Sequence, residues 1–535
     1  MLTIDNLSLS FGQRVLFEKV SLKFTAGNCY GIIGANGSGK SSFLKIISGD
    51  IEASHGNFSI EKNKRIAVLR QDQFEFDDSP VLETVVKGNQ KLFNIIQEKD
   101  ALYAKEIFND EDGIRAAELE GDFAEMNGWE ADSDAAKLLS DLGIMDDQHA
   151  LLMKELPGST KVKVLLAQTL FGNPDILIMD EPTNNLNAET ILWLENFLAH
   201  FKNTVLLVSH DRHFLNNVCT HTVDIDYRTM KTYTGNYEFW KEASKLAMQQ
   251  QKDQNKRAEA KREELKAFVQ RFSANASKAK QATSRKNLLE KMVIEEVLPS
   301  TRRYPHLHFQ PHRNLGEKIL NIKNLSQTMN GNTLFKDISF DILKGDKVAF
   351  IGDPLSITAL MDIISGEVKA KSGTFEWGTT TAHTYFPKEH SQYFSENMNL
   401  IEWLRQYAPK DEDETFVRGF LGKMLFSGDE ALKQVSVLSG GEKVRCMFSR
   451  MMLFEANVLI LDEPTAHLDL ESITALNDGL MKSECILLFT SHDFQFSQTI
   501  ANRIIEITPK GIIDKVLTFE EYLFDPKIKE LRKSL

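Results

Sequence analysis

A glycine-rich segment carries the clearest chemical signal in the sequence. Gly34-Ala-Asn-Gly-Ser-Gly-Lys-Ser41 follows the apolar pair Ile32-Ile33, and a helical pattern begins at Phe43. Glycines let backbone N–H groups surround phosphate oxygens, Lys40 has the length to reach the β- and γ-phosphates of a nucleotide, and Ser41 offers an oxygen to Mg²⁺. A strand, this loop and a helix in that order therefore predict a phosphate loop. The residues expected to contact the nucleotide are Gly34, Ala35, Asn36, Gly37, Ser38, Gly39, Lys40, Ser41 and Ser42.

Two carboxylates end a later apolar segment, Asp175-Ile-Leu-Ile-Met-Asp-Glu181. Parallel strands end at one edge of a sheet, so Asp180 and Glu181 are expected beside the phosphate loop. Asp180 is expected to hold Mg²⁺, directly or through water, and Glu181 to orient and deprotonate the attacking water. An isolated Asp-Glu pair is more often a solvated turn, and the phosphate loop upstream is what favours the catalytic interpretation. His210 follows a third apolar segment and is expected to contact the γ-phosphate, although a lone histidine is usually structural.

The chain contains an internal repeat. Leu7-Ser-Leu-Ser-Phe-Gly-Gln-Arg-Val-Leu-Phe17 recurs as a related segment ending at Phe335, and Asp180-Glu-Pro-Thr recurs at Asp462. Phe17 and Phe335 are 318 residues apart, whereas Asp180 and Asp462 are only 282 apart. The first copy therefore holds about 36 extra residues between these two positions. The charged, helix-patterned stretch at about 88–128 is the natural place for it, and we expect a helical arm there.

Composition and charge limit the class of protein. With 535 residues, 42% hydrophobic and 26% charged, the chain is predicted to be a multidomain globular protein. A net charge of -13 argues against a protein that coats nucleic acid over its whole surface. No apolar run approaches the roughly 18 residues of a membrane helix, and no signal peptide is visible, so a cytoplasmic location is expected. The cysteines form no C-x-x-C pair and are expected in the apolar core: Cys29, Cys219, Cys446 and Cys485.

The segment between the two copies is locally basic. From Lys252 to Lys291 twelve Lys and Arg stand against five Asp and Glu, which leaves -20 on the rest of the chain. Proline is absent from Phe239 to Leu298 and helix formers dominate, so two long helices or a helical hairpin are expected. A charge run is most often a solvated helix face, and RNA binding is the alternative. The cations available for phosphate contacts are Lys256, Arg257, Lys261, Arg262, Arg271, Lys278, Lys280, Arg285 and Lys286.

These motifs, together with Leu438-Ser-Gly-Gly-Glu-Lys443, resemble the ATP-binding cassette superfamily. In that family the helix N-terminus at Ser439, Gly440, Gly441 and Glu442 meets the γ-phosphate bound by the opposite cassette. The resemblance also implies that Gln71 senses Mg²⁺ and water, that Phe11 stacks on adenine, and that Ser41, Gln71 and Asp180 form the metal site. Two cassettes with a helical linker and no membrane span resemble the ABC-F subfamily, most of all its bacterial YbiT type.

The implied fold is α/β, with two P-loop ATPase domains that carry helical subdomains and are joined by a long α-helical linker. We expect the first cassette at 1–238, the linker at 239–316 and the second cassette at 317–535. The cassettes are expected to pair within one chain, which makes a monomer the expected state.

The two copies depart from the family pattern in complementary places. The second cassette reads Gly352-Asp-Pro-Leu-Ser-Ile-Thr-Ala-Leu-Met-Asp-Ile-Ile-Ser-Gly366, with no lysine in any register, and Met329 and Lys388 stand at the adenine and glutamine positions. In the first cassette Pro157 and Ser159 alter the signature, and Asn187 stands where Asp469 is retained in the second. In a head-to-tail pair the intact loop faces the intact signature. We therefore expect one competent composite site and one degenerate site, in which Thr358 is the candidate for the Mg²⁺ hydroxyl.

The resemblance implies an ATP-gated translation factor. Its linker would enter the ribosome from the tRNA exit site and contact tRNA and ribosomal RNA, with ATP and Mg²⁺ as cofactors and slow hydrolysis by Glu181 at one site. The alternatives are an ATPase subunit of a membrane transporter and a nearly inactive ATP-binding regulatory module. Ribosomal protection against antibiotics is less favoured because the linker is short.

Overall fold

The computed structural model describes residues 1–12, 14–70, 72–105, 108–184, 186, 188–272, 284, 287, 302–329 and 331–534. The chain forms two compact units. The first comprises Met1–Leu186, Thr190–Ser209 and Phe214–Thr301, and the second comprises Asn187–Glu189, His210–His213 and Arg302–Leu535.

The first unit contains two sheets. An antiparallel sheet has the order β2-β1-β4, and a six-stranded sheet has the order β5-β6-β7-β3-β8-β9. The strands are β1 (Leu2–Phe11), β2 (Arg14–Phe24), β3 (Cys29–Gly34), β4 (His55–Ile60), β5 (Ile66–Val68), β6 (Ile176–Asp180), β7 (Thr204–Val208), β8 (His221–Asp226) and β9 (Thr229–Thr234). Strands β3 and β7 are buried along their whole length, as expected of central parallel strands that are covered on both faces.

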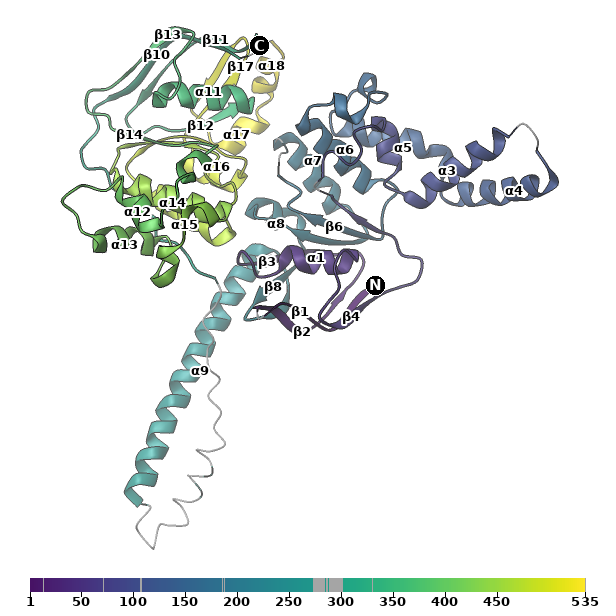
Figure 1. Cartoon of the computed structure of the whole chain (residues 1–535), viewed down its shortest axis with the longest axis horizontal. Helices are drawn as coiled ribbons and strands as arrows, with labels where there is room; N and C mark the ends of the chain where they lie inside the picture. Colours follow the sequence, from purple (N-terminus) through teal and green to yellow (C-terminus); the bar gives the residue numbers. More distant parts are fainter. Residues whose placement is uncertain are drawn as a thin grey trace. The chain divides into compact units, whose positions relative to one another are not determined.

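Helices α1 (Lys40–Ser48) and α6 (Gly158–Leu170) belong to the first unit, with α2 (Val81–Val86) and α5 (Ala131–Asp141). Helices α7 (Ala188–Ala199) and α8 (Arg212–Val218) also belong to it except for their first two residues, which fall in the second unit. Between α2 and α5 the chain forms a helical hairpin of α3 (Gln90–Tyr103) and α4 (Asp110–Glu125), which projects from the unit (Figure 1). Ion pairs of Lys99 with Glu120 and of Arg115 with Glu98 join the two helices. A helical arm therefore lies in the stretch where the repeat offsets predict an insertion.

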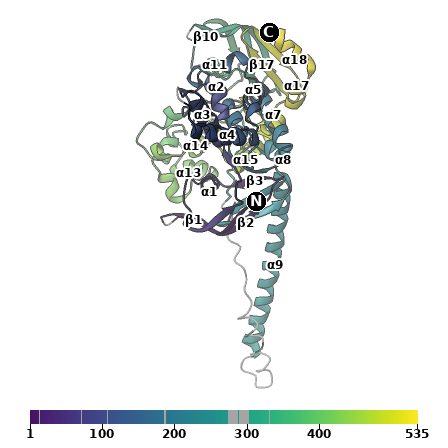
Figure 2. The ribbon, with the colours of Figure 1, turned by 90° about the vertical axis from the view of Figure 1, so that its right-hand side faces the viewer.

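A single long helix follows β9. Helix α9 (Tyr237–Phe272) has 36 residues, which at 1.5 Å per residue is about 54 Å. Its first turns are anchored, because Trp240 is buried and its Nε1 donates a hydrogen bond to Asp224 over 3.1 Å. Beyond them the helix runs outward as one rod (Figures 1 and 2). The first of the expected linker helices is present, and the second falls mostly on residues outside those described.

The second unit repeats the strand order of the first. Its sheets have the orders β11-β10-β13 and β14-β15-β16-β12-β17-β18. The strands are β10 (Lys318–Met329), β11 (Asn332–Leu343), β12 (Lys347–Gly352), β13 (Ser372–Trp377), β14 (His383–Phe386), β15 (Val458–Asp462), β16 (Ile486–Thr490), β17 (Arg503–Thr508) and β18 (Gly511–Lys515). The helices are α11 (Pro354–Ser365), α12 (Leu400–Arg405), α13 (Glu414–Lys423), α14 (Gly440–Leu453), α15 (Leu470–Lys482), α16 (Phe494–Ile500), α17 (Phe519–Phe524) and α18 (Pro526–Ser534). The internal repeat is thus a repeat of architecture.

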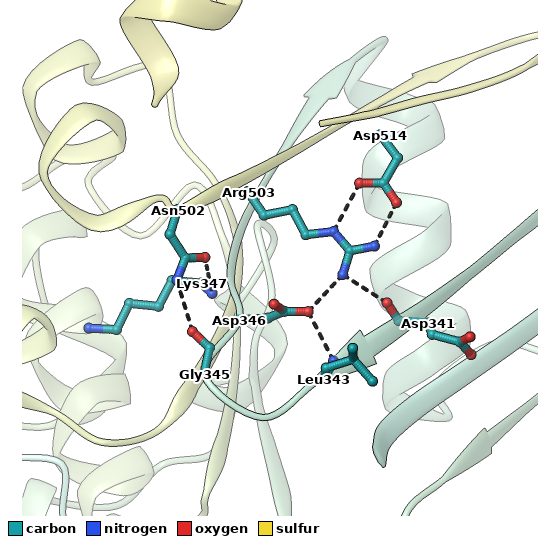
Figure 3. A network of polar contacts seen from close by, with 8 residues as sticks. All are labelled: Asp341, Leu343, Gly345, Asp346, Lys347, Asn502, Arg503 and Asp514. Carbon is teal, nitrogen blue, oxygen red and sulfur yellow. Dashed lines mark hydrogen bonds and ion pairs between the residues drawn. The ribbon is translucent and has the colours of Figure 1, made fainter. Parts of the chain in front are cut away.

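An arginine joins the two sheets of the second unit. Arg503, the first residue of β17, donates from Nε and Nη2 to the carboxylate of Asp514 over 2.9 and 2.6 Å. Its Nη1 reaches Asp346 Oδ2 at 2.7 Å and the carbonyl of Asp341 on β11 at 2.9 Å (Figure 3). The hydrogen bonds that Arg503 donates to Asp514 raise the pKa of this guanidinium despite partial burial. The contact holds β11 against the sheet that carries β12.

The four cysteines are all buried and reduced. The sulfur atoms of Cys29 and Cys219 lie 4.0 Å apart, and their contact together with burial raises the pKa of the Cys29 thiol. Burial alone is the main cause of the raised pKa at Cys446 and Cys485. Their assignment to the apolar core is confirmed, because a buried neutral thiol behaves as a small hydrophobic group.

Candidate nucleotide site

The glycine-rich loop connects β3 to α1 in the first unit. Gly37 and Gly39 have φ of 74° and 102°, in the left-handed region that favours glycine. Gly39 is the N-cap of α1, and no side chain among the described residues caps that helix end. The first N–H groups of a helix lack partners within it, so this end is suited to bind an anion.

Two side chains in the loop show how it would receive phosphate. Lys40 is 8% exposed and donates to the carbonyls of Gly34 and Ala35 over 2.8 and 3.3 Å. The Oγ of Ser38 is buried and has no hydrogen-bond partner among the residues described. A buried hydroxyl without a partner is costly, and a bound phosphate would supply an acceptor. The loop therefore fits a nucleotide phosphate.

The expected carboxylates lie at the same edge of the sheet as this loop. Asp180 ends β6 and pairs in register with Val208 of β7, which in turn pairs with Ile32 of β3, two residues before the loop begins. Glu181 follows with φ of 52°, and its N–H donates to the carbonyl of Val208 over 2.8 Å. Strand pairing thus brings together residues of β3, β6 and β7, which are distant in the sequence. His210 lies two residues beyond β7, in a segment that belongs to the second unit.

The remaining predicted contacts of the first unit are more dispersed. Phe11 ends β1 and is 57% exposed, so its ring is free of the core and open to a planar ligand. Gln71 lies outside the described residues. Ser41 and Ser42 are in the first turn of α1. Ser41 with Asp180 supplies oxygen ligands of the kind that Mg²⁺ prefers.

Arg14 is a loop contact that motif analysis missed. Its Nη2 donates to the carbonyl of Gly37 over 2.9 Å, and an added Cβ at Gly37 would lie 2.7 Å from the same nitrogen. Arg14 begins β2 and carries no motif of its own. Its role follows from the packing of the three-stranded sheet beside the loop, which residue spacing does not reveal.

The intact signature starts helix α14 of the second unit. Ser439 is the N-cap, and its Oγ accepts from the N–H of Glu442 while the N–H of Ser439 donates to Glu442 Oε2 over 2.8 Å. Burial opposes ionisation of Glu442, but hydrogen bonds from Lys433 and Ser439 outweigh it and lower its pKa. This capping box holds a helix end with Gly440 and Gly441 in its first turn.

The altered signature forms a weaker helix start. Pro157 is the N-cap of α6, and no described side chain caps that helix end. Lys161 in the next turn forms an ion pair with Asp77. The first unit thus keeps the position of this helix but lacks the serine hydroxyl found at Ser439.

Two cassette domains, a phosphate loop and a signature helix define this chain as a tandem ATP-binding cassette protein. A family model described as "ABC transporter" matches residues 17–184 and 335–466, and a second with the same description matches residues 223–309. The chain therefore belongs to the ATP-binding cassette family, and its relatives are of the ABC-F type. Among the described residues no helix is long and apolar enough to cross a membrane.

Individual relatives match over nearly the whole chain. "Uncharacterized ABC transporter ATP-binding protein YkpA" of Bacillus subtilis (strain 168) is 56% identical over 99% of this chain and 98% of its own length. "Probable ATP-binding protein YbiT" of Escherichia coli O157:H7 is 43% identical over 98% of this chain and 99% of its own. A solved structure of "archaeal ribosome recycling factor aABCE1" has the same overall fold, with a TM-score of 0.59, 15% identity and coverage of 99% of this chain and 98% of that one. The predicted family and fold class are confirmed.

Proposed function

We propose that this protein is a cytoplasmic ATP hydrolase that binds ribosomes under the control of ATP and acts in translation. Its main support is a group of exposed cations on α9. Lys256, Arg257, Lys261 and Arg262 are all exposed on a helix that projects from the first unit. Cations exposed in this way can reach RNA phosphates, and each phosphate that they neutralise releases bound counterions, which favours binding.

The chemistry that we propose uses the residues at the edge of the first sheet. The uncapped N-terminus of α1 and Lys40 bind the phosphates, and Glu181 accepts the proton of the attacking water. Mg²⁺, held by Ser41 and Asp180, would neutralise charge that develops on the phosphate oxygens. We propose that Ser439 and its helix complete this site in the ATP-bound state, and that hydrolysis releases it.

The exposed cations of α9 favour a ribosomal role over a transporter role. The aABCE1 structure of similar fold is that of a complex with an archaeal ribosomal stalk protein, so this architecture is compatible with ribosome binding. A role as a transporter subunit would give the cations of α9 no anionic partner to bind. We propose contacts of α9 with ribosomal RNA and exit-site tRNA, made by a monomer.

Cosedimentation with ribosomes tests this proposal. The protein should pellet with ribosomes in a non-hydrolysable ATP analogue and remain in the supernatant with ADP. Replacing Lys256, Arg257, Lys261 and Arg262 by Gln should weaken binding and lower the slope of log affinity against log salt by about 3, since each lost phosphate contact removes about 0.7 to 0.9.

A control variant on the same helix removes negative charge instead of positive charge. Glu263 and Glu264 are also exposed on α9, and replacing both by Gln should leave binding unchanged or strengthen it. Ribosome binding that ignores the nucleotide, or equal losses in both variants, would contradict the proposal. Ribosome binding without ATP turnover would instead favour the regulatory module.

A further inference from the structure

The second cassette has a helix where the first has its phosphate loop. In the first unit β3 ends at Gly34 and α1 begins at Lys40, whereas in the second β12 ends at Gly352 and α11 begins at Pro354. A single residue, Asp353, therefore connects strand and helix. The segment that would cradle phosphate has become the first turn of α11.

The C-terminal ends of α1 and α11 fix how the two helices align in sequence. Both end at a left-handed glycine, Gly49 with φ of 85° and Gly366 with φ of 88°. Counting back from these glycines places Thr358 at the position of Ser41 and Ile357 at that of Lys40. Ile357 is 4% exposed in the apolar core, so an aliphatic side chain occupies the place of the phosphate-binding lysine.

Asp353 supplies the negative charge that a phosphate would bring. Its Oδ2 accepts from the backbone N–H of Ser356 over 3.0 Å and lies 2.9 Å from the Ser356 hydroxyl. Pro354 has no N–H to offer at the next position. The end of α11 is thus capped by a carboxylate, whereas no described side chain caps the equivalent end of α1.

A direct hydrogen bond stands where the metal site would lie. Thr358 Oγ1 donates to Asp462 Oδ2 over 2.7 Å, and these two residues align with Ser41 and Asp180. Next to them the carboxylate of Glu463 accepts from the backbone N–H of His492 over 3.1 Å and lies 3.2 Å from its ring Nε2. In the second cassette Thr358 is therefore bonded to Asp462, and Glu463 to His492.

We propose that the second cassette binds no nucleotide, because its own side chains fill the phosphate and metal positions. Asp353 takes the place of phosphate on α11, and the Thr358–Asp462 hydrogen bond takes the place of Mg²⁺. One ATP per chain then drives the protein, and ATP binding follows a simple hyperbola. This inference rests on the proposed ATP binding by the first cassette, but the experiments below can refute either statement without the other.

Photolabelling of the full chain with an azido analogue of ATP locates the bound nucleotide directly. Peptide mapping should find label in residues 2–60 of the first cassette and none in residues 318–377, the corresponding segment of the second cassette. Equilibrium dialysis with a non-hydrolysable analogue should give one nucleotide per parent chain and none for Lys40→Ala. Label in residues 318–377, two nucleotides per parent chain, or one retained by Lys40→Ala would overturn the inference; label near Ser439 would not, because that helix is proposed to complete the first site. No binding to the parent would refute ATP binding by the first cassette while leaving the second assigned as empty.

A pair of variants tests the capping carboxylate. Asp353→Asn keeps an N-cap acceptor, whereas Asp353→Ala removes it. Hydrogen exchange in the first turns of α11 should rise about fivefold in the Ala variant and stay near parental in the Asn variant. Equal exchange in all three proteins would show that Asp353 does not fill this helix end and would overturn that part of the inference.

Discussion

Thr358 and Asp462 are joined by a hydrogen bond of 2.7 Å across the second cassette, from the first turns of α11 to the end of β15. Asp462 is 1% exposed, and burial is the main cause that raises its pKa to about 6. The hydrogen bond from Thr358 opposes this rise and the nearby Glu463 adds to it. At neutral pH this carboxylate is therefore ionised, and its ionisation lowers the free energy of unfolding.

Asp462→Asn should remove a pH-dependent cost. A carboxyl group whose folded pKa lies above its unfolded value favours the fold when protonated, so the cost is absent below about pH 4 and complete above about pH 6. The shift corresponds to roughly 3 kcal/mol at neutral pH. Asn keeps an acceptor for Thr358. The melting temperature of the variant should exceed that of the parent by a few degrees at pH 7.5 and by less at pH 5. A difference that is constant with pH would contradict this.

Glu181→Gln should bind ATP and hydrolyse it at least about 100-fold more slowly, because a general base contributes that much or more to rate. The variant should also stay with ribosomes in ATP, as measured by cosedimentation. Glu463→Gln is the matched control in the other cassette and should leave turnover near that of the parent. Equal loss in the two variants would mean that both cassettes hydrolyse ATP.

Ser439→Asp tests whether the signature of the second cassette serves the loop of the first. Aspartate is as good an N-cap as serine, so α14 should remain folded, but it adds a negative charge at the helix end proposed to meet phosphate. Turnover should fall by more than about tenfold, since charge repulsion at a desolvated site costs over about 1.4 kcal/mol. Pro157→Asp makes the corresponding change in the first cassette and should leave turnover unaltered. The opposite ranking would contradict the proposed division of labour.

Arg503→Lys should destabilise the second unit by about 2 kcal/mol, because a lysine cannot keep the paired bonds to Asp514 together with those to Asp346 and Asp341. Denaturant unfolding of the full chain measures the loss. Arg418→Lys is a suitable comparison, since Arg418 forms an exposed pair with Glu414 on α13 and its replacement should cost under about 0.5 kcal/mol. Similar losses in both variants would mean that the network of Figure 3 contributes little.

Much of the first cassette could be predicted from local sequence. Gly34 to Ser41 lie consecutively, and each of their roles depends on residue type at fixed spacing. The helix start at Asp353 and Pro354 also had a readable signal, because an Asp N-cap followed by Pro is typical of a helix N-terminus. The degenerate loop expected after Gly352 is instead the start of helix α11, which begins at Pro354.

The sequence by itself determined the repeat, the family and the residues of one phosphate loop, since these depend on order and spacing along the chain. Tertiary structure alone decided that Thr358 meets Asp462 and that Arg14 holds Gly37. Both contacts join segments from different elements, and the distance between two side chains from different elements depends on strand pairing and helix packing. The second cassette depends on both, because Asp353 caps α11 through a local contact with Ser356, whereas the Thr358–Asp462 hydrogen bond joins two distant elements.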